Sequence, residues 1–128
     1  MPDYVEYEKR DQIAIIRLNR PDRLNAIGTA MLADLARAFI RFENDEPFVA
    51  VLTGTGRAFS AGFDIKQNIE AGNAHLEPLD IRPLVNPFWP QNADETGRGR
   101  TLDKPVVAAI NGLAFGGGLL LALHADIC

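Results

Sequence analysis

Two short segments near the start of the chain combine apolar and polar side chains in patterns typical of strands. Residues 4–8 mix aromatic and β-branched residues with glutamates, residues 12–18 are mostly apolar, and the charged residues 9–11 separate them. The pattern therefore predicts a β-hairpin. Residues 19–23 contain Pro21 and are expected to form a loop, because proline restrains the residue before it and donates no hydrogen bond to a sheet.

A helical period follows the hairpin. Between Thr29 and Asn44, apolar residues recur at helical spacing, with charged residues between them. These apolar residues are Met31, Leu32, Leu35, Phe39 and Phe42. The spacing predicts an amphipathic helix with Thr29 as its N-cap.

Further apolar runs predict the remaining elements. Residues 48–53 and 106–110 are short apolar runs next to turn residues, which is typical of buried strands. A second helix is expected over residues 65–71, and a third begins at the triple glycine 116–118. This alternation of strands and helices indicates an α/β fold in which neighbouring strands run parallel.

The chain shows no sign of a second domain. Residues 72–103 contain four prolines and no clear period, and no linker or repeat divides the chain. Residues 1–128 are therefore expected to form part of one domain. Residues 124–128 resemble the beginning of another strand, whereas domains usually close with a polar, surface-lying terminus. We therefore expect the natural chain to continue beyond Cys128.

The composition narrows the class of protein. Hydrophobic residues make up 47% of the chain and charged residues 23%, which is typical of a globular domain rather than a disordered tail. The net charge of −4 makes the chain a poor candidate for binding nucleic acid through its phosphates. No apolar run reaches the ~18 residues of a membrane span. The first residues lack the pattern of a signal peptide, so a cytoplasmic location is expected.

Few residue types suited to metal binding or redox chemistry are present. Cys128 is the single cysteine and cannot form an internal disulfide. His75 and His124 have no carboxylate at a ligand-like spacing, so we expect no metal site.

Two loops that contain glycine carry the most functional information. Residues 58–65 follow a predicted strand, and residues 111–118 lead from a strand into a helix. A triple glycine at a helix start lets a ligand approach the backbone N–H groups, and the helix dipole favours negative charge there. The alternative is that the glycines only permit close packing of the helix on a strand. Neither loop has the spacing of a nucleotide-binding fingerprint.

Three motifs follow one another along the chain. They are Asn19-x-Pro21-x-x-x-Asn25-Ala26, Phe59-Ser60-Ala61-Gly62-x-Asp64 and Lys104-Pro105-Val106-Val107-Ala108-Ala109-Ile110-Asn111-Gly112-x-Ala114-x-Gly116-Gly117-Gly118. Together they resemble the crotonase family of enoyl-CoA hydratases and isomerases. The resemblance implies a crotonase-like α/β spiral of β-β-α turns, of which this chain covers the N-terminal part, before the helical segment that forms trimers. It also implies a homotrimer or a dimer of trimers for the full-length chain.

The resemblance further implies chemistry on an acyl-CoA thioester, with a role in fatty acid metabolism. Two backbone N–H groups, those of Phe63 and Gly117, would form an oxyanion hole for the thioester carbonyl. Such preorganised donors stabilise the charge that develops on this oxygen. The residues expected to contact CoA or the acyl group are Arg23, Leu24, Ala26, Ala61, Asp64, Ile65, Lys66, Gly116 and Leu120. Coenzyme A would enter as part of the substrate, and no permanently bound cofactor is expected.

Two of these assignments have simple alternatives. Asp64 is also placed to cap a helix, and both roles are compatible. Lys66 fits a solvated helix charge better than a phosphate ligand, whereas the motif favours a phosphate contact for Arg23.

One position departs from the family pattern. Hydratases of the family place the first of two catalytic glutamates three residues after the middle glycine, and Leu120 stands there. Leucine cannot transfer a proton, so the resemblance favours an isomerase over a hydratase. The later catalytic acid would lie beyond Cys128. A CoA-binding relative without catalysis and an inactive fragment are the alternatives, and the acyl group and the pathway stay open.

Overall fold

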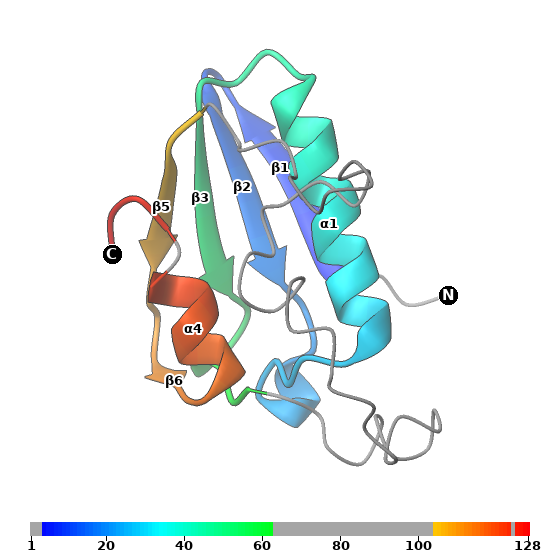
Figure 1. The fold of residues 1–128 in the computed structure, drawn as a ribbon, viewed down its shortest axis with the longest axis vertical. Coiled ribbons are helices and arrows are strands. Elements are labelled where there is room, and N and C mark those ends of the chain that lie inside the picture. Colours follow the sequence, from blue (N-terminus) through cyan, green and yellow to red (C-terminus); the bar gives the residue numbers. More distant parts are fainter. Residues whose placement is uncertain (1–3, 63–103, 124) are drawn as a thin grey trace, which may run out of the picture.

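The computed structural model describes residues 4–62, 104–123 and 125–128. Its elements, in chain order, are β1 (Val5–Arg10), β2 (Ile13–Leu18), the 3-10 helix η1 (Pro21–Arg23), α1 (Thr29–Glu43), β3 (Val49–Gly54), β4 (Ala58–Ser60), β5 (Val106–Ala109), β6 (Leu113–Ala114) and α4 (Gly117–Leu123) (Figure 1). The helix expected over 65–71 and the irregular stretch 72–103 lie outside the described residues.

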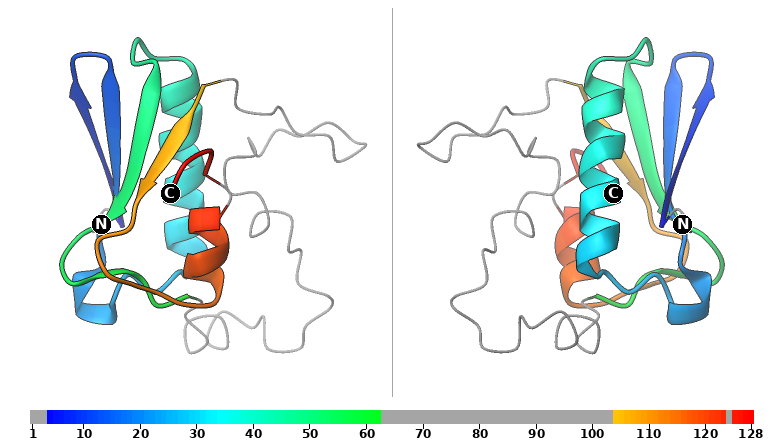
Figure 2. Two further views of the ribbon diagram at one scale, coloured as in Figure 1. Left: turned by 90° about the vertical axis from the view of Figure 1, so that its left-hand side faces the viewer. Right: turned by 90° about the vertical axis from the view of Figure 1, so that its right-hand side faces the viewer.

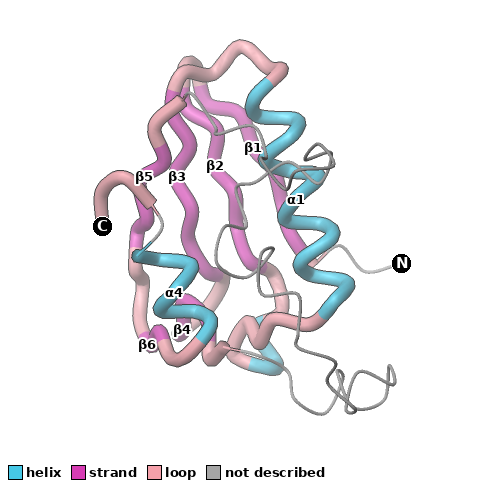
Figure 3. The backbone as a smooth tube through the Cα atoms, viewed as in Figure 1, coloured by secondary structure: helices cyan, strands magenta, loops and turns pink. Residues whose placement is uncertain are grey.

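Four strands form the main sheet in the order β1-β2-β3-β5 (Figure 3). β1 and β2 pair antiparallel as the predicted hairpin, and β2 with β3 and β3 with β5 pair parallel, as expected. The turn is shorter than predicted, because Lys9 and Arg10 still pair with β2. β1 is an edge strand, and such strands tolerate charged side chains. Asp11 forms the turn with a left-handed φ of 53°, a conformation that aspartate tolerates better than most residues.

Among the described elements, α1 and α4 cover the same face of this sheet (Figure 2). Strand residues alternate between the buried face and the opposite face, as their period of two predicts. Leu35 and Phe42 of α1 and Leu121 of α4 are buried against this face. The core of the described residues comprises Ala14, Ile16, Leu18, Ile27, Met31, Leu35, Ala38, Phe39, Phe42, Ala50, Leu52, Phe59, Val106, Ala108, Leu121 and Ala122. None of the described helices combines the length and the apolar character that crossing a membrane requires.

The beginning of α1 differs from the prediction. Gly28, not Thr29, is the N-cap, and no side chain caps the helix. Gly28 has an extended backbone, with φ −104° and ψ −179°, and its carbonyl accepts the N–H of Leu32 at 3.0 Å. Thr29 is therefore the first helical residue, and the predicted N-cap is wrong by one position.

The end of the described chain agrees with the expectation of a further strand. Ile127 forms a parallel bridge with Val107 of β5, and its carbonyl accepts the N–H of Ala108 at 2.7 Å. Residues 125–128 therefore return to the free edge of the main sheet.

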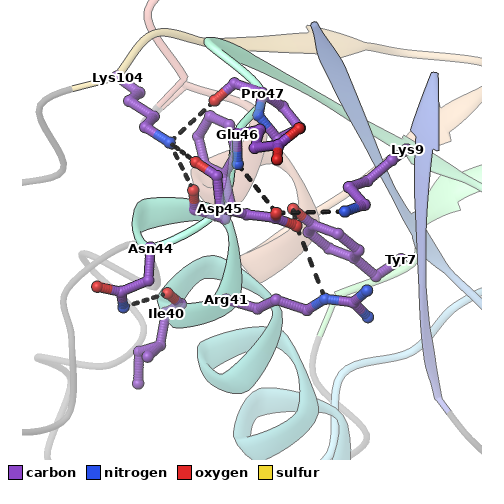
Figure 4. Close-up of polar contacts among 10 residues, drawn as sticks. Tyr7, Lys9, Ile40, Arg41, Asn44, Asp45, Glu46, Pro47 and Lys104 are labelled. Atoms are coloured by element: carbon purple, nitrogen blue, oxygen red, sulfur yellow. Dashed lines mark hydrogen bonds and ion pairs between the residues drawn. The ribbon is translucent and has the colours of Figure 1, made fainter. Parts of the chain in front are cut away.

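Lys104 holds the end of α1 against the start of β5 (Figure 4). Its ammonium group donates to the carbonyl oxygens of Phe42, Asp45 and Pro47 at 2.8, 2.7 and 2.9 Å, and it lies 4.9 Å from the centre of the Phe42 ring. Carbonyls at a helix end lack partners within the helix, and positive charge is favourable there. One side chain thus joins α1, β3 and β5.

A second polar contact beside it joins β1 to the same helix end. The Asp45 carboxylate accepts hydrogen bonds from the Tyr7 hydroxyl at 3.0 Å and from Lys9 at 3.3 Å. A hydrogen bond from the N–H of Glu46 is the main cause that lowers the pKa of Asp45. Burial, together with the Asp45 carboxylate, raises the pKa of Tyr7 to about 12. Tyr7 is therefore a neutral hydrogen-bond donor at physiological pH.

We expect Lys104→Met to destabilise the protein markedly. The substitution keeps an apolar stem over Phe42 but removes all three hydrogen bonds, and we expect a loss of about 2–3 kcal/mol in the free energy of unfolding in urea. Lys9→Met is the matched control: it removes one exposed ion pair and should cost less than about 1 kcal/mol. Equal losses in the two variants would contradict the role given to Lys104.

Candidate functional site

The two glycine loops meet around the short strand β4. All three of its residues are buried, and it pairs in parallel with β6, Ala58 opposite Leu113 and Ser60 opposite Ala114. Figure 3 shows this small second sheet beside α4, at the carboxyl ends of β2 and β3. Ligand sites of open α/β sheets commonly lie at this end of the strands.

Asn25 attaches the first motif to β4. It is fully buried, with a left-handed φ of 55° that asparagine tolerates. Its amide nitrogen donates to the carbonyls of Thr55 and Ala58, both at 3.0 Å, and its amide oxygen accepts the N–H of Arg20 at 2.7 Å. The side chain therefore has a partner for each of its polar atoms, and it fixes the path of residues 20–25.

Asn111 makes a similar contact from the third motif. Its amide nitrogen donates to the carbonyls of Gly56 at 2.9 Å and Ala58 at 3.0 Å, and its oxygen accepts the N–H of Gly54 at 3.0 Å. The Ala58 carbonyl consequently accepts hydrogen bonds from two asparagine side chains, one from each flanking motif.

Ser60 contacts all three motifs. It is fully buried, and its hydroxyl donates to the Asn25 carbonyl at 2.8 Å and accepts the N–H of Gly62 at 3.2 Å. Its own carbonyl accepts the N–H of Phe115 at 3.0 Å.

The loop after β4 runs alongside the first motif. The N–H of Ala61 donates to the Leu24 carbonyl at 2.9 Å, and the Gly62 carbonyl accepts the N–H of Ile27 at 2.7 Å. Gly62 has a φ of 96°, a conformation that glycine adopts without strain.

The three glycines of the third motif differ in their roles. Gly116 has a left-handed φ of 51°, and a Cβ there would meet open space. Gly117 is the first residue of α4, which begins within the triple glycine as predicted. A Cβ on Gly118 would lie 2.5 Å from the Ser60 carbonyl oxygen, so no side chain fits. Close packing thus explains Gly118, whereas Gly116 has room for a Cβ and owes its glycine to its left-handed φ.

The structure brings together only part of the predicted site. The predicted residues that it describes are Arg23, Leu24, Ala26, Ala61, Gly116, Gly117 and Leu120, the last two through their backbone. The remaining four, Phe63, Asp64, Ile65 and Lys66, lie outside the described residues. Arg23 is exposed at the end of η1, and the loops that carry Leu24, Ala61 and Gly116 adjoin one another through Ser60.

Sequence reasoning gave no role to Asn25, Ser60 and Asn111. All three belong to the motifs, and the structure shows that their side chains make the contacts that join the loops. Their signal was the presence of small polar residues between apolar ones, which marks either a turn or a buried hydrogen-bonding group. In residues 4–62, 104–123 and 125–128, no three His, Cys, Asp or Glu side chains gather closely enough to hold a metal ion.

Comparison with known proteins identifies the family that the chain resembles in sequence. Residues 8–128 match the model of the enoyl-CoA hydratase/isomerase family. The chain is 36% identical over 129 residues to the mitochondrial enoyl-CoA hydratase of Pongo abelii, across 98% of this chain and 41% of that protein. It is 38% identical over 130 residues to a carnitinyl-CoA dehydratase of Citrobacter koseri, across 98% of this chain and 45% of that protein.

A solved structure supports the same relationship. The enoyl-CoA hydratase from Thermoplasma volcanium matches with a TM-score of 0.77 and 39% identity, over 98% of this chain and 47% of that one. The chain thus spans a little under half the length of the relatives it matches. The predicted crotonase-like α/β fold is confirmed. By its sequence match and by its fold, the chain belongs to the enoyl-CoA hydratase/isomerase family.

Proposed function

We propose that the protein acts on acyl-CoA thioesters and stabilises a thioester enolate between the backbone N–H groups of Phe63 and Gly117. The parallel pairing of β4 with β6 carries this proposal. Because the carboxyl ends of parallel strands meet at one edge, the loop after β4 and the loop after β6 open to the same place. The first loop leads to Phe63, and the second leads to Gly117 at the start of α4.

The chemistry follows from where negative charge develops. When the later catalytic acid of the full natural chain, in its carboxylate form, takes a proton from the carbon next to the thioester carbonyl, the electron pair moves onto the carbonyl oxygen. Two backbone donors that face this oxygen would stabilise the enolate, and each is worth ~3–4 kcal/mol in comparable sites. The electron pair of the enolate then forms a new C–H bond with a returning proton. This bond forms either at the same carbon or at the far end of an adjacent double bond.

The CoA moiety is proposed to lie along the first motif and the loop after β4. The hydrogen bonds from Ala61 to Leu24 and from Ile27 to Gly62 place these two segments side by side. Arg23 is exposed beside them and offers positive charge for a phosphate. The other proposed contacts are Ala26, Asp64, Ile65, Lys66, Gly116 and Leu120. The site as proposed needs no permanently bound cofactor.

Leu120 favours double-bond isomerisation over water addition in this proposal. The relatives are named hydratases and a dehydratase, whereas a leucine at this position supplies no proton. The second candidate function is binding of CoA without catalysis. This alternative also rests on Leu120, because leucine supplies no proton. We propose a trimer or a dimer of trimers as the assembly and the cytoplasm as its location.

Acyl-CoA thioesters should bind more tightly than free CoA. Hydrogen bonds to the carbonyl should add roughly 1–3 kcal/mol for acetyl-CoA in isothermal titration calorimetry of the full natural chain. S-ethyl-CoA is the matched control, because it has the same chain length without the carbonyl, and it should bind like CoA. Equal affinities for all three ligands would contradict the oxyanion hole.

Crotonyl-CoA should be hydrated slowly by the wild-type protein. The position that Leu120 occupies lacks the carboxylate that general acid–base catalysis requires, a contribution of roughly 10²–10⁴ in rate. Leu120→Glu should raise the hydration rate, whereas Leu120→Gln, of the same size without a transferable proton, should not. The hydration rate is measured from the loss of crotonyl-CoA absorbance. A wild-type rate equal to that of efficient hydratases would contradict the isomerase preference.

Gly117→Pro should strongly slow turnover of a 3-enoyl-CoA and leave CoA affinity nearly unchanged. Proline lacks the N–H group, and its φ suits the first residue of a helix, where Gly117 stands. We expect kcat to fall by about two to three orders of magnitude. Gly117→Ala retains the N–H group and should lose far less. An unchanged kcat in folded Gly117→Pro would show that this N–H group does not serve as a donor.

A further inference from the structure

We propose that Ser60 is a positioning residue of this site: its hydroxyl orients the loop that follows β4 for catalysis without touching the substrate. This proposal rests on the proposed function. Ser60 is fully buried, and its hydroxyl uses both its donor and its acceptor capacity within the protein, on the Asn25 carbonyl at 2.8 Å and the Gly62 N–H at 3.2 Å. A group held in this way acts through its neighbours.

Gly62 is the residue whose freedom the hydroxyl restricts. Glycine has the widest range of backbone conformations, and Gly62 adopts a φ of 96° that other residues rarely reach. Its N–H is held by Ser60, and its carbonyl is held by the N–H of Ile27 at 2.7 Å. Because peptide groups are planar, these two bonds fix the peptide plane on each side of its α-carbon. The plane that follows Gly62 contains the proposed donor of the first loop.

Ser60 also determines how close the second loop lies. Its carbonyl accepts the N–H of Phe115 at 3.0 Å, and a Cβ on Gly118 would lie 2.6 Å from the Ser60 Cβ. The distance between the two loops therefore depends on the backbone of Ser60, whereas its hydroxyl, together with the N–H of Ile27, orients the first loop at Gly62. The two contributions can be separated by substitution.

Ser60→Ala removes the hydroxyl and keeps the backbone contacts to the second loop. We expect kcat for isomerisation of a 3-enoyl-CoA to fall about tenfold, less than the 10²–10³-fold effect of losing a donor outright, because the donor is loosened rather than removed. The affinity for CoA should stay within about threefold, since the residues that are proposed to bind it keep their backbone partners. Ser60→Cys, with a weakly hydrogen-bonding thiol, should give an intermediate kcat.

A spectroscopic measurement separates positioning from general stability. The infrared carbonyl stretch of bound acetyl-CoA, labelled with ¹³C at the carbonyl, reports the hydrogen bonds to that oxygen. In Ser60→Ala this stretch should move back toward its value in solution. Tyr7→Phe is the matched control, since it removes one hydroxyl hydrogen bond, at 3.0 Å to Asp45, at the opposite end of the sheet. It should lower the melting temperature without moving kcat or the carbonyl stretch.

The possible outcomes distinguish this proposal from the proposed function. A wild-type protein that neither isomerises a 3-enoyl-CoA nor prefers acetyl-CoA to S-ethyl-CoA overturns both. Wild-type activity with an unchanged kcat and carbonyl stretch in Ser60→Ala and Ser60→Cys overturns only the role of Ser60. A CoA affinity that falls in proportion to kcat also overturns it, because the hydroxyl would then support the whole loop rather than its orientation.

Discussion

The site depends on one backbone carbonyl that two side chains share. The carbonyl of Ala58 accepts the amide groups of Asn25 and Asn111, each at 3.0 Å, and so joins the first motif to the third across the second. A strand of three residues has too few ladder hydrogen bonds to hold its own place. The asparagine side chains supply the missing hydrogen bonds to Ala58, a buried residue whose carbonyl would cost about 1–3 kcal/mol if it were left unpaired. The path of the chain through Ser60 and Gly62 follows from this arrangement.

The two ends of the main sheet are held by different kinds of polar contact. At one end, Lys104 and Asp45 join α1 to the strands through charged groups on backbone and hydroxyl partners (Figure 4). At the other end, Asn25, Ser60 and Asn111 are neutral, and their hydrogen bonds lie between loops. The contacts that hold these loops together therefore use no charged side chain among Asn25, Ser60 and Asn111.

The sequence predicted those elements that have a helical period or an apolar run of sufficient length. α1, β2, β3 and β5 were all predicted within one or two residues, because α1 has a clear helical period and each of the three strands contains a recognisable apolar run. β4 and β6 are too short to show one, and they form because of hydrogen bonds between distant residues, such as Asn25 with Ala58 and Ser60 with Asn25. Thr29 has a typical capping side chain, yet the extended backbone of Gly28 made it the N-cap. For the site, the sequence motifs located the loops. The roles of Asn25 and Ser60 became apparent only from their hydrogen bonds in the structure.

The close approach of Gly118 to Ser60 affects how a mutational scan of the triple glycine should be interpreted. The nearest neighbour of an added Cβ is the Ser60 carbonyl oxygen, a backbone atom that no substitution at position 60 removes. Position 118 therefore stays restricted to glycine as long as β4 and β6 remain paired, whatever reaction the protein performs. If substitutions of Gly118 are not tolerated, the reason is the short distance between its backbone and that of Ser60. This restriction would be equally strong in a family member that had lost catalysis, so evolutionary retention of this glycine carries no information about activity.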